Sequence, residues 1–147
     1  RFLAAMARNA VNRTPPLGFF RTFVMEKNGH ENRSINIKRR GTAPMVDLIR
    51  IHALACGSRA QNSFDRLDDI AKTQLLTPNA VEKIRYALEF MSMTRIWHHL
   101  YDVEAGTEPD NSIEPENVSN SERHNLKDAF QVLSNAQSFL QFRYPRP

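Results

Sequence analysis

The feature that most constrains the fold is a long helical segment expected at residues 78–104. Thr77 and Pro78 form a helix start, because a threonine side chain caps the first turn and proline fits the first helical position. Successive helical residues lie about 100° apart, which gives this segment two apolar arcs. One arc holds Val81, Ile84, Leu88 and Met91, and the other holds Tyr86, Phe90, Met93, Trp97 and Leu100. Apolar residues on two sides predict a central member of a helical bundle.

Three further segments carry the signals of bundle helices. Pro44 and Gly57 bracket a helix over 44–56. The sequence "NSFDRLDDIAKTQLL" predicts a second helix, with Phe64, Leu67 and Ile70 or Ala71 facing inward. "SNSE" at 119–122 is a capping box that opens a last helix to about residue 143. The inner stripe of this last helix is Leu126, Phe130, Leu133, Gln137 and Leu140.

The first forty residues are less regular. Helix formers over 2–12 predict a short helix, which "RTPPLG" ends because proline lacks a backbone donor. "FFRTFVME" and "SINIK" contain aromatic and β-branched residues, which favour a small β-hairpin or two extended arms within 19–38. The predicted fold class is therefore all-α: a helical bundle of four main helices plus an N-terminal helix.

Composition narrows the function classes. The chain has 147 residues, 41% hydrophobic and 24% charged, which predicts one soluble domain. No apolar run approaches the roughly 20 residues that cross a bilayer, and the single Cys56 fits a reducing cytoplasm. Residues 1–50 hold ten Lys or Arg against three Asp or Glu. No aromatic-interleaved basic motif accompanies this charge, so we do not expect a nucleic-acid partner.

The first apolar arc of 78–104 becomes polar in its last two turns, where it reaches Arg95, His98, His99 and Asp102. The 44–56 helix carries Asp47 and Arg50 in a similarly apolar setting. Buried charges cost several kcal/mol unless they are paired, so we expect this pair to couple with Arg95, His98 or Asp102, with Gln137 completing the network. Two interpretations stay open: a structural network that fixes helix register, or a polar-lined cavity for an anionic or polar ligand.

We recognise no catalytic motif in the sequence. The adjacent His98 and His99 point about 100° apart and cannot grip one metal ion together. The chain has no Gly-rich phosphate loop or nucleophile elbow, and its carboxylates do not follow a calcium-loop or two-metal pattern. We therefore expect no metal site and no catalytic residue here, and a complete small enzyme is kept only as a rival interpretation.

Six long blocks occur in the order of a known family: "PPLGFFRTFV", "INIKRRGTAPMVDLIRIHAL", "FDRLDDI", "ALEFMSMTRIWHHL", "AGTEPDNSIEPENVSNSERHNLKDAFQVL" and "AQSFLQFRYP". Together they resemble the C-terminal putative nucleotidyltransferase substrate-binding domain of bacterial signal-transduction proteins, over about residues 14–145. In that family a cyclic-nucleotide-binding-like module, CBS domains and a uridylyltransferase-like nucleotidyltransferase domain commonly precede it.

The resemblance implies a non-catalytic accessory domain at 14–147, with 1–13 as a helix that links it to an upstream nucleotidyltransferase domain. It implies no cofactor in these residues, and a nucleoside triphosphate with Mg²⁺ in the parent protein. The implied partners are the catalytic domain, a nucleotide or a protein acceptor, and a second copy in a homodimer. A pure docking or dimerisation module with a structural polar network is the alternative.

The resemblance also assigns residues. Lys38, Arg50 and Arg95 are the expected anion contacts, since a guanidinium offers a planar fork to phosphate or carboxylate. Asp47 and Asp102 would orient the arginines, and Asn111 would tether the acidic loop to the bundle. The family often has Gln where His99 stands and Asp where Asn36 stands, which puts the ligand preference in doubt. The full expected substrate-binding set is Lys38, Asp47, Arg50, Arg66, Arg95, His98, His99, Asp102, Asn111 and Lys127.

Overall fold

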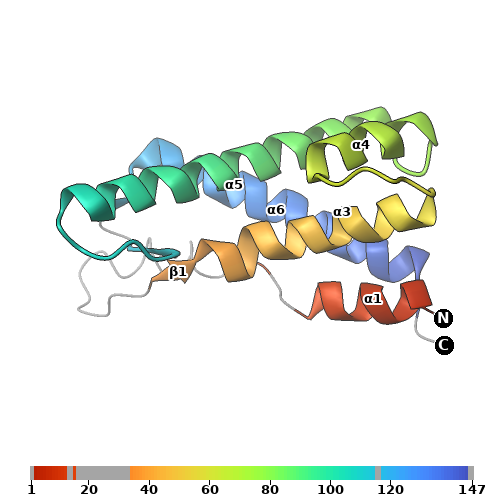
Figure 1. Ribbon diagram of the computed structural model, residues 1–147, viewed down its shortest axis with the longest axis horizontal. Coiled ribbons are helices and arrows are strands. Elements are labelled where there is room, and N and C mark those ends of the chain that lie inside the picture. Colours follow the sequence, from red (N-terminus) through yellow and green to blue (C-terminus); the bar gives the residue numbers. More distant parts are fainter. Residues whose placement is uncertain (1, 13–14, 16–33, 115–116, 146–147) are drawn as a thin grey trace.

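The protein is a bundle of helices with one very small sheet (Figure 1). The computed structural model describes residues 2–12, 15, 34–114 and 117–145. Its elements are α1 (Phe2–Val11), β1 (Ile35–Asn36), the π-helical turn η1 (Lys38–Thr42), α3 (Ala43–Ala55), α4 (Ser63–Lys72), α5 (Pro78–Glu104), β2 (Ser112–Ile113) and α6 (Asn120–Arg143). The predicted all-α fold, with four main helices and an N-terminal helix, is confirmed.

Side-chain caps set the start of three helices, because they satisfy backbone N–H groups that have no partner within the helix. The Asn62 side chain accepts from Asp65 N, and the Thr77 hydroxyl accepts from Ala80 N. The Ser119 hydroxyl likewise accepts from Glu122 N. After α3 the chain turns at Gly57, whose φ of 74° lies in the left-handed region that favours glycine. The long helix α5 spans Pro78–Glu104, which is the range that the sequence predicts.

The two longest helices, α5 and α6, run alongside one another in opposite directions, and α3 and α4 pack onto them (Figure 1). Helix α1 packs on α3 and α6. The predicted inner stripe of α6 is buried along its whole length. Gln137 within this stripe donates to the carbonyl of Ala10 at 3.3 Å, so it ties α6 to the end of α1. This bond links Gln137 to α1 and not to the polar residues of α3 and α5 with which it was expected to form a network. No helix in the described ranges is long and apolar enough to cross a membrane.

The short extended segment before α3 pairs with the chain ahead of α6. Ile35 lies opposite Ile113 and Asn36 opposite Ser112 in an antiparallel pair. Most of the hairpin predicted within 19–38, namely residues 19–33, lies outside the described residues. Within them, the partner of the "SINIK" segment comes from the loop after α5 and is more than seventy residues away in sequence.

Gly41 in η1 lets the backbone approach α5 and α6 closely. A Cβ atom at this position would lie 2.9 Å from Met91 Sδ and 3.0 Å from Phe130 Cε1. Both of these neighbours are fully buried. Any other side chain would therefore have to displace packed atoms in the centre of the core.

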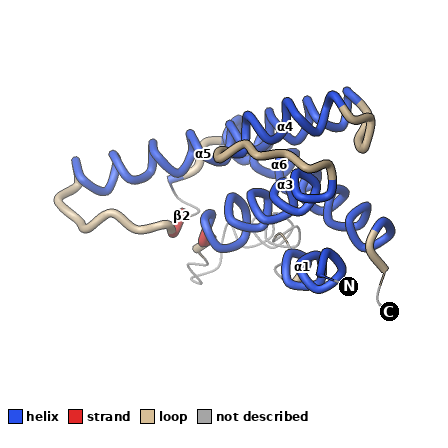
Figure 2. Tube along the Cα trace, turned by 45° about the vertical axis from the view of Figure 1, so that its right-hand side comes forward, coloured by secondary structure: helices blue, strands red, loops and turns tan. Residues whose placement is uncertain are grey.

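The second apolar arc of α5 is not buried, so the prediction of a helix covered on two sides is wrong. Tyr86, Met93, Trp97 and Leu100 are 61%, 56%, 64% and 50% exposed, respectively. Helix α4 packs against α5 but has only ten residues against twenty-seven. At 1.5 Å per residue it spans about 15 Å of a helix of about 40 Å. The second half of α5 extends past it (Figures 1 and 2).

His52 is a buried polar residue in the last turn of α3, where it is 1% exposed. Its ring lies between the rings of Phe139 and Tyr144, with centroids 6.0 and 6.3 Å away. Burial, together with the smaller effect of the positive charge of Arg143, lowers the pKa of His52 from 6.5 to about 4. The imidazole is therefore neutral at physiological pH.

Acidification is expected to destabilise the fold through His52. Between the folded pKa of about 4 and the unfolded value of 6.5, the unfolded chain binds a proton that the folded chain excludes. The free energy of unfolding therefore falls as the pH drops through this window, by about 2 kcal/mol at about pH 5, and this group adds no pH dependence above about pH 7. Urea unfolding at about pH 5 and about pH 7 measures this difference in the free energy of unfolding.

The matched control is a second histidine. His52→Phe is expected to flatten the pH dependence, whereas His124→Phe, at a solvent-exposed position on α6, leaves most of it in place. If the His52→Phe variant loses as much stability on acidification as the unmodified chain, the explanation is wrong.

Candidate functional site

The predicted polar residues of α3 do not meet those of α5. Asp47 and Arg50 contact each other across one helical turn, with Oδ1 and Nη1 3.7 Å apart, and their side chains are 45% and 48% exposed. The expectation that this pair couples with Arg95, His98 or Asp102 is therefore wrong. A pair that is almost half exposed keeps much of its hydration, so neither charge needs a partner from another helix.

Arg95 and His99 of α5 both contact Asn111 in the following loop. Arg95 Nε donates to Asn111 Oδ1 at 2.7 Å, and His99 Nε2 lies 3.1 Å from the same oxygen. The backbone carbonyl of Asn111 accepts from Ile37 N at 2.9 Å. Asn111 thus tethers the loop to α5 and to the segment that leads into α3, which is the role expected of it.

Asp102 orders the same loop, and it contacts no arginine among the residues that the structure describes. Its backbone carbonyl accepts from the amide and the hydroxyl of Thr107, at 2.9 and 3.0 Å. Its carboxylate accepts from Asp110 N at 3.3 Å. The predicted role of orienting a guanidinium is therefore not what this carboxylate does. Instead it closes the turn that follows α5.

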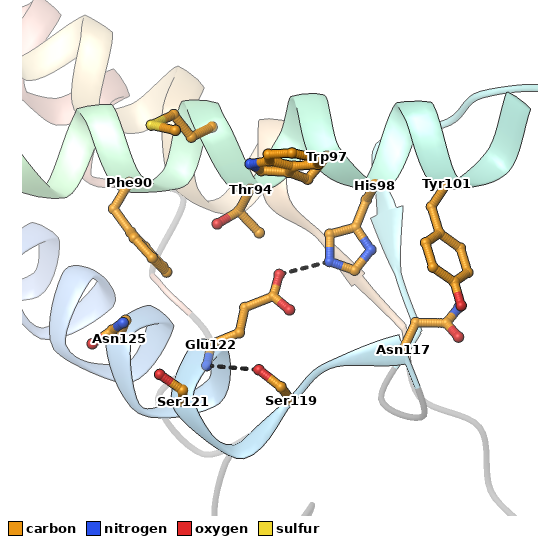
Figure 3. A pocket seen from close by; sticks show the side chains of 11 residues that line it. Phe90, Thr94, Trp97, His98, Tyr101, Asn117, Ser119, Ser121, Glu122 and Asn125 are labelled. Carbon is orange, nitrogen blue, oxygen red and sulfur yellow. Dashed lines mark hydrogen bonds and ion pairs between the residues drawn. The ribbon is translucent and has the colours of Figure 1, made fainter. Parts of the chain in front are cut away.

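His98 forms a contact between α5 and α6. Its Nε2 lies 2.7 Å from Glu122 Oε1, and both side chains are largely buried, with 11% and 23% exposed (Figure 3). In a capping box the glutamate would return to the backbone at Ser119. Only half of that exchange is present: the Ser119 hydroxyl accepts from Glu122 N at 3.1 Å. The carboxylate turns to His98 and joins the two longest helices.

This contact lies in a pocket of about 460 Å³ between the second half of α5 and the start of α6, here called the α5–α6 pocket. Its walls combine large apolar side chains with amides, hydroxyls and the His98–Glu122 pair. Figure 3 shows Phe90, His98 and Tyr101 projecting from α5 on the side that faces α6. The lining residues are Phe90, Met93, Thr94, Trp97, His98, Tyr101, Asn117, Ser119, Ser121, Glu122 and Asn125.

The expected substrate-binding residues are distributed over several sites. Of that set, only His98 lines the α5–α6 pocket. Lys38 is exposed on η1, Lys127 is exposed on α6, and Arg66 donates through Nε to the Ala60 carbonyl at 3.0 Å. Within the described ranges no three His, Cys, Asp or Glu side chains are grouped closely enough to hold a metal ion.

Sequence reasoning missed most of the pocket. Trp97 and Tyr101 are four residues apart and flank His98, a spacing that places three ring-bearing side chains on one part of a helix surface. The glutamate of the capping box was a second signal. The capping-box pattern assigns its carboxylate to a local backbone bond, whereas this carboxylate contacts His98 in the pocket. Neither pattern indicates that the other helices leave this part of α5 uncovered. The pocket forms only where they do.

The fold and the pocket define a helical domain with a surface pocket in which aromatic side chains lie beside polar ones. The chain belongs to the family described as "putative nucleotidyltransferase substrate binding domain", which matches residues 1–144. No curated protein and no solved structure matches the chain significantly. The family assignment made from the sequence blocks is confirmed.

Removal of the Asn111 amide is expected to destabilise the fold. Asn111→Leu leaves the part-buried Arg95 Nε and His99 Nε2 without their shared acceptor, and the expected loss in the free energy of unfolding is about 1–3 kcal/mol. Asn111→Asp keeps an acceptor oxygen and should cost less. Urea unfolding of both variants measures the losses, and equal losses would show that the shared acceptor is not what matters.

Proposed function

We propose that the chain is a non-catalytic accessory domain of a nucleotidyltransferase and that it binds the nucleoside part of a nucleotide in the α5–α6 pocket. The observation that carries this proposal is the combination of exposed aromatic rings with a partly buried His98–Glu122 pair in one cavity. The family description supports a substrate-binding role. The volume of about 460 Å³ is within the range of small-ligand sites.

The chemistry of the lining suits a nucleoside. Aromatic side chains stack on bases whatever the base is, because every base has a π-face. Trp97 and Tyr101 are more than half exposed and offer such faces at the rim. Asn117 and Asn125 supply amide donors and acceptors for base edges, and the second oxygen of Glu122 can accept from a ribose hydroxyl.

The phosphate groups require cations, and the lining of the pocket includes no lysine or arginine. Arg95 uses Nε for Asn111, so its terminal NH₂ groups stay available for an anion. We therefore keep Arg95 as the proposed anion contact for this nucleotide, and an anion-binding role for Arg50 and Lys38 stays a prediction from the sequence. In this proposal the Mg²⁺ that accompanies a nucleoside triphosphate is held by the catalytic domain.

Nucleotide binding is testable through tryptophan fluorescence, because Trp97 is the chain's single tryptophan. Titration with ATP or UTP in the presence of Mg²⁺ is expected to quench its emission to a plateau, since a stacked base quenches an indole. Glu122→Ala is expected to raise Kd by about fivefold or more, the equivalent of one lost hydrogen bond. Glu82→Ala, which removes an exposed carboxylate from the same bundle, is the matched control. Unchanged emission with millimolar nucleotide would rule the proposal out.

A second role for α5 is supported by its exposed apolar face. Six large apolar residues within eleven positions are at least half exposed, namely Met93, Ile96, Trp97, Leu100, Tyr101 and Val103. Contiguous apolar surface of this kind commonly marks an interaction site. We propose that this face packs on the nucleotidyltransferase domain, so that the bound nucleoside lies at the junction of the two domains. The alternative is a pure docking or dimerisation module without a ligand.

A negative charge introduced on this apolar face should separate docking from ligand binding. Leu100→Glu is expected to weaken association with the separately expressed nucleotidyltransferase domain about tenfold or more, because a carboxylate would be buried in an apolar contact. Leu54→Glu introduces the same change at an exposed leucine on α3 and should have no effect. Sedimentation velocity of the mixture measures association, and sedimentation of the chain alone reports a homodimer. Equal association of the two variants would exclude this face as the docking surface.

A further inference from the structure

The α5–α6 pocket contains a carboxylate with one oxygen still free to bond. Glu122 reaches from α6 toward α5, where its Oε1 lies 2.7 Å from His98 Nε2 (Figure 3). The second oxygen, Oε2, makes no hydrogen bond to the described residues, and it is not one of their buried polar atoms. The side chain is 23% exposed and lines the pocket. A ligand in the pocket can therefore reach this oxygen.

The chemistry of this oxygen restricts what can bind beside it. An ionised carboxylate accepts hydrogen bonds and donates none. No lysine or arginine is among the described residues that line the pocket, so the lining itself offers Oε2 no cationic partner. A ligand that fills this space without offering a donor would leave a charged acceptor unpaired, which weakens the complex. The group placed against Oε2 is therefore a neutral donor such as a hydroxyl.

A nucleotide can meet this requirement in one orientation. The 2′- and 3′-hydroxyls of a ribose lie at the other end of the sugar from the 5′-phosphates. If the diol faces Glu122, the phosphates point away from the carboxylate and toward the mouth of the pocket. The reverse orientation would place a polyanion against a carboxylate, and the two would repel each other.

The aromatic rings of the pocket lie close enough to hold the base of the same nucleoside. Trp97 directly precedes His98 on α5, and Tyr101 follows His98 by about one helical turn. Both rings are more than half exposed, whereas the His98–Glu122 pair is largely buried. A base on the rings at the rim thus places its sugar next to the carboxylate that lies deeper.

We propose that Glu122 makes the α5–α6 pocket selective for ribonucleotides, because its Oε2 accepts from the ribose diol. This inference rests on the proposed function, since it names the sugar that the same pocket recognises. His98 is a positioning residue in this arrangement, because its contact with Oε1 holds the carboxylate in place. Sites that bond a substrate hydroxyl reject analogues without it, since a polar group of the site is then left unpaired.

ATP and 2′,3′-dideoxy-ATP are matched probes, because they share the base and the phosphates and differ only in the two hydroxyls. Titration of the 147-residue chain with each, in the presence of Mg²⁺, is followed through the emission of Trp97. Both nucleotides are expected to quench it to the same plateau, since the same base stacks in each case. The Kd of the dideoxy nucleotide should be about fivefold higher or more, the effect of a lost hydrogen bond to a carboxylate.

Two carboxylate variants show whether Glu122 is the acceptor. Glu122→Ala removes it, so the two nucleotides should then bind with equal Kd. Glu82→Ala removes an exposed carboxylate elsewhere on α5 and should keep the preference for ATP. The ratio of the two Kd values is the readout, because a loss of folded protein would affect both nucleotides equally and leave the ratio unchanged.

The positioning role of His98 has its own pair of variants. His98→Phe keeps a ring on α5 but removes the N–H group that faces Oε1, so the ratio of the Kd values should fall. His98→Gln returns an amide N–H near the position of Nε2 and should restore part of the ratio.

The outcomes separate this inference from the proposed function. If both nucleotides quench the emission with equal Kd, nucleotide binding stands and selection of the sugar is wrong. A preference for ATP that persists in Glu122→Ala would overturn the role of Glu122 in the same way. Absence of quenching with millimolar ATP would overturn both the proposed function and this inference.

Discussion

The packing of α5 on α6 is the interaction on which the rest of this structure depends. The two helices have 27 and 24 residues, whereas α3 and α4 have 13 and 10. The shorter helices cover only part of the long pair, and the second half of α5 extends past α4 (Figures 1 and 2). This difference in length explains the exposed apolar arc of α5. It also explains why the α5–α6 pocket lies where it does.

Several polar side chains in this fold fix one segment against another. Glu122 joins α6 to α5 through His98, and Asn111 joins the loop after α5 to Arg95 and to the chain before α3. Gln137 joins α6 to α1. His52 differs, because one of its ring nitrogens is buried without a hydrogen bond among the described residues.

Much of the helical architecture could be predicted from the sequence, because helix boundaries are set by local chemistry. Thr77 and Ser119 cap their helices as expected, and the stripe from Leu126 to Leu140 is buried as expected. Periodicity states which residues share a face, but it does not state what covers that face. The second arc of α5 was therefore misjudged, and so was the outward-facing pair of Asp47 and Arg50.

The candidate site was harder to predict, for related reasons. The contact between His98 and Glu122 joins residues 24 positions apart and replaces a local bond that the capping box favours. The extended segment at Ile35 pairs with Ile113 and not with a sequence neighbour. Contacts of this kind depend on how the helices are placed in space. A binding role for the other expected residues, from Lys38 to Lys127, stays a prediction.

Gly41 gives the bundle a fixed spacing. Because a Cβ atom at this position would lie within 3.0 Å of Met91 and Phe130, only a residue without a side chain lets the start of α3 pack this closely against the two long helices. A methyl group there would displace the segment before α3, whose Ile37 N–H group donates to the Asn111 carbonyl. The geometry at one end of the molecule is thus set by the smallest residue in the chain.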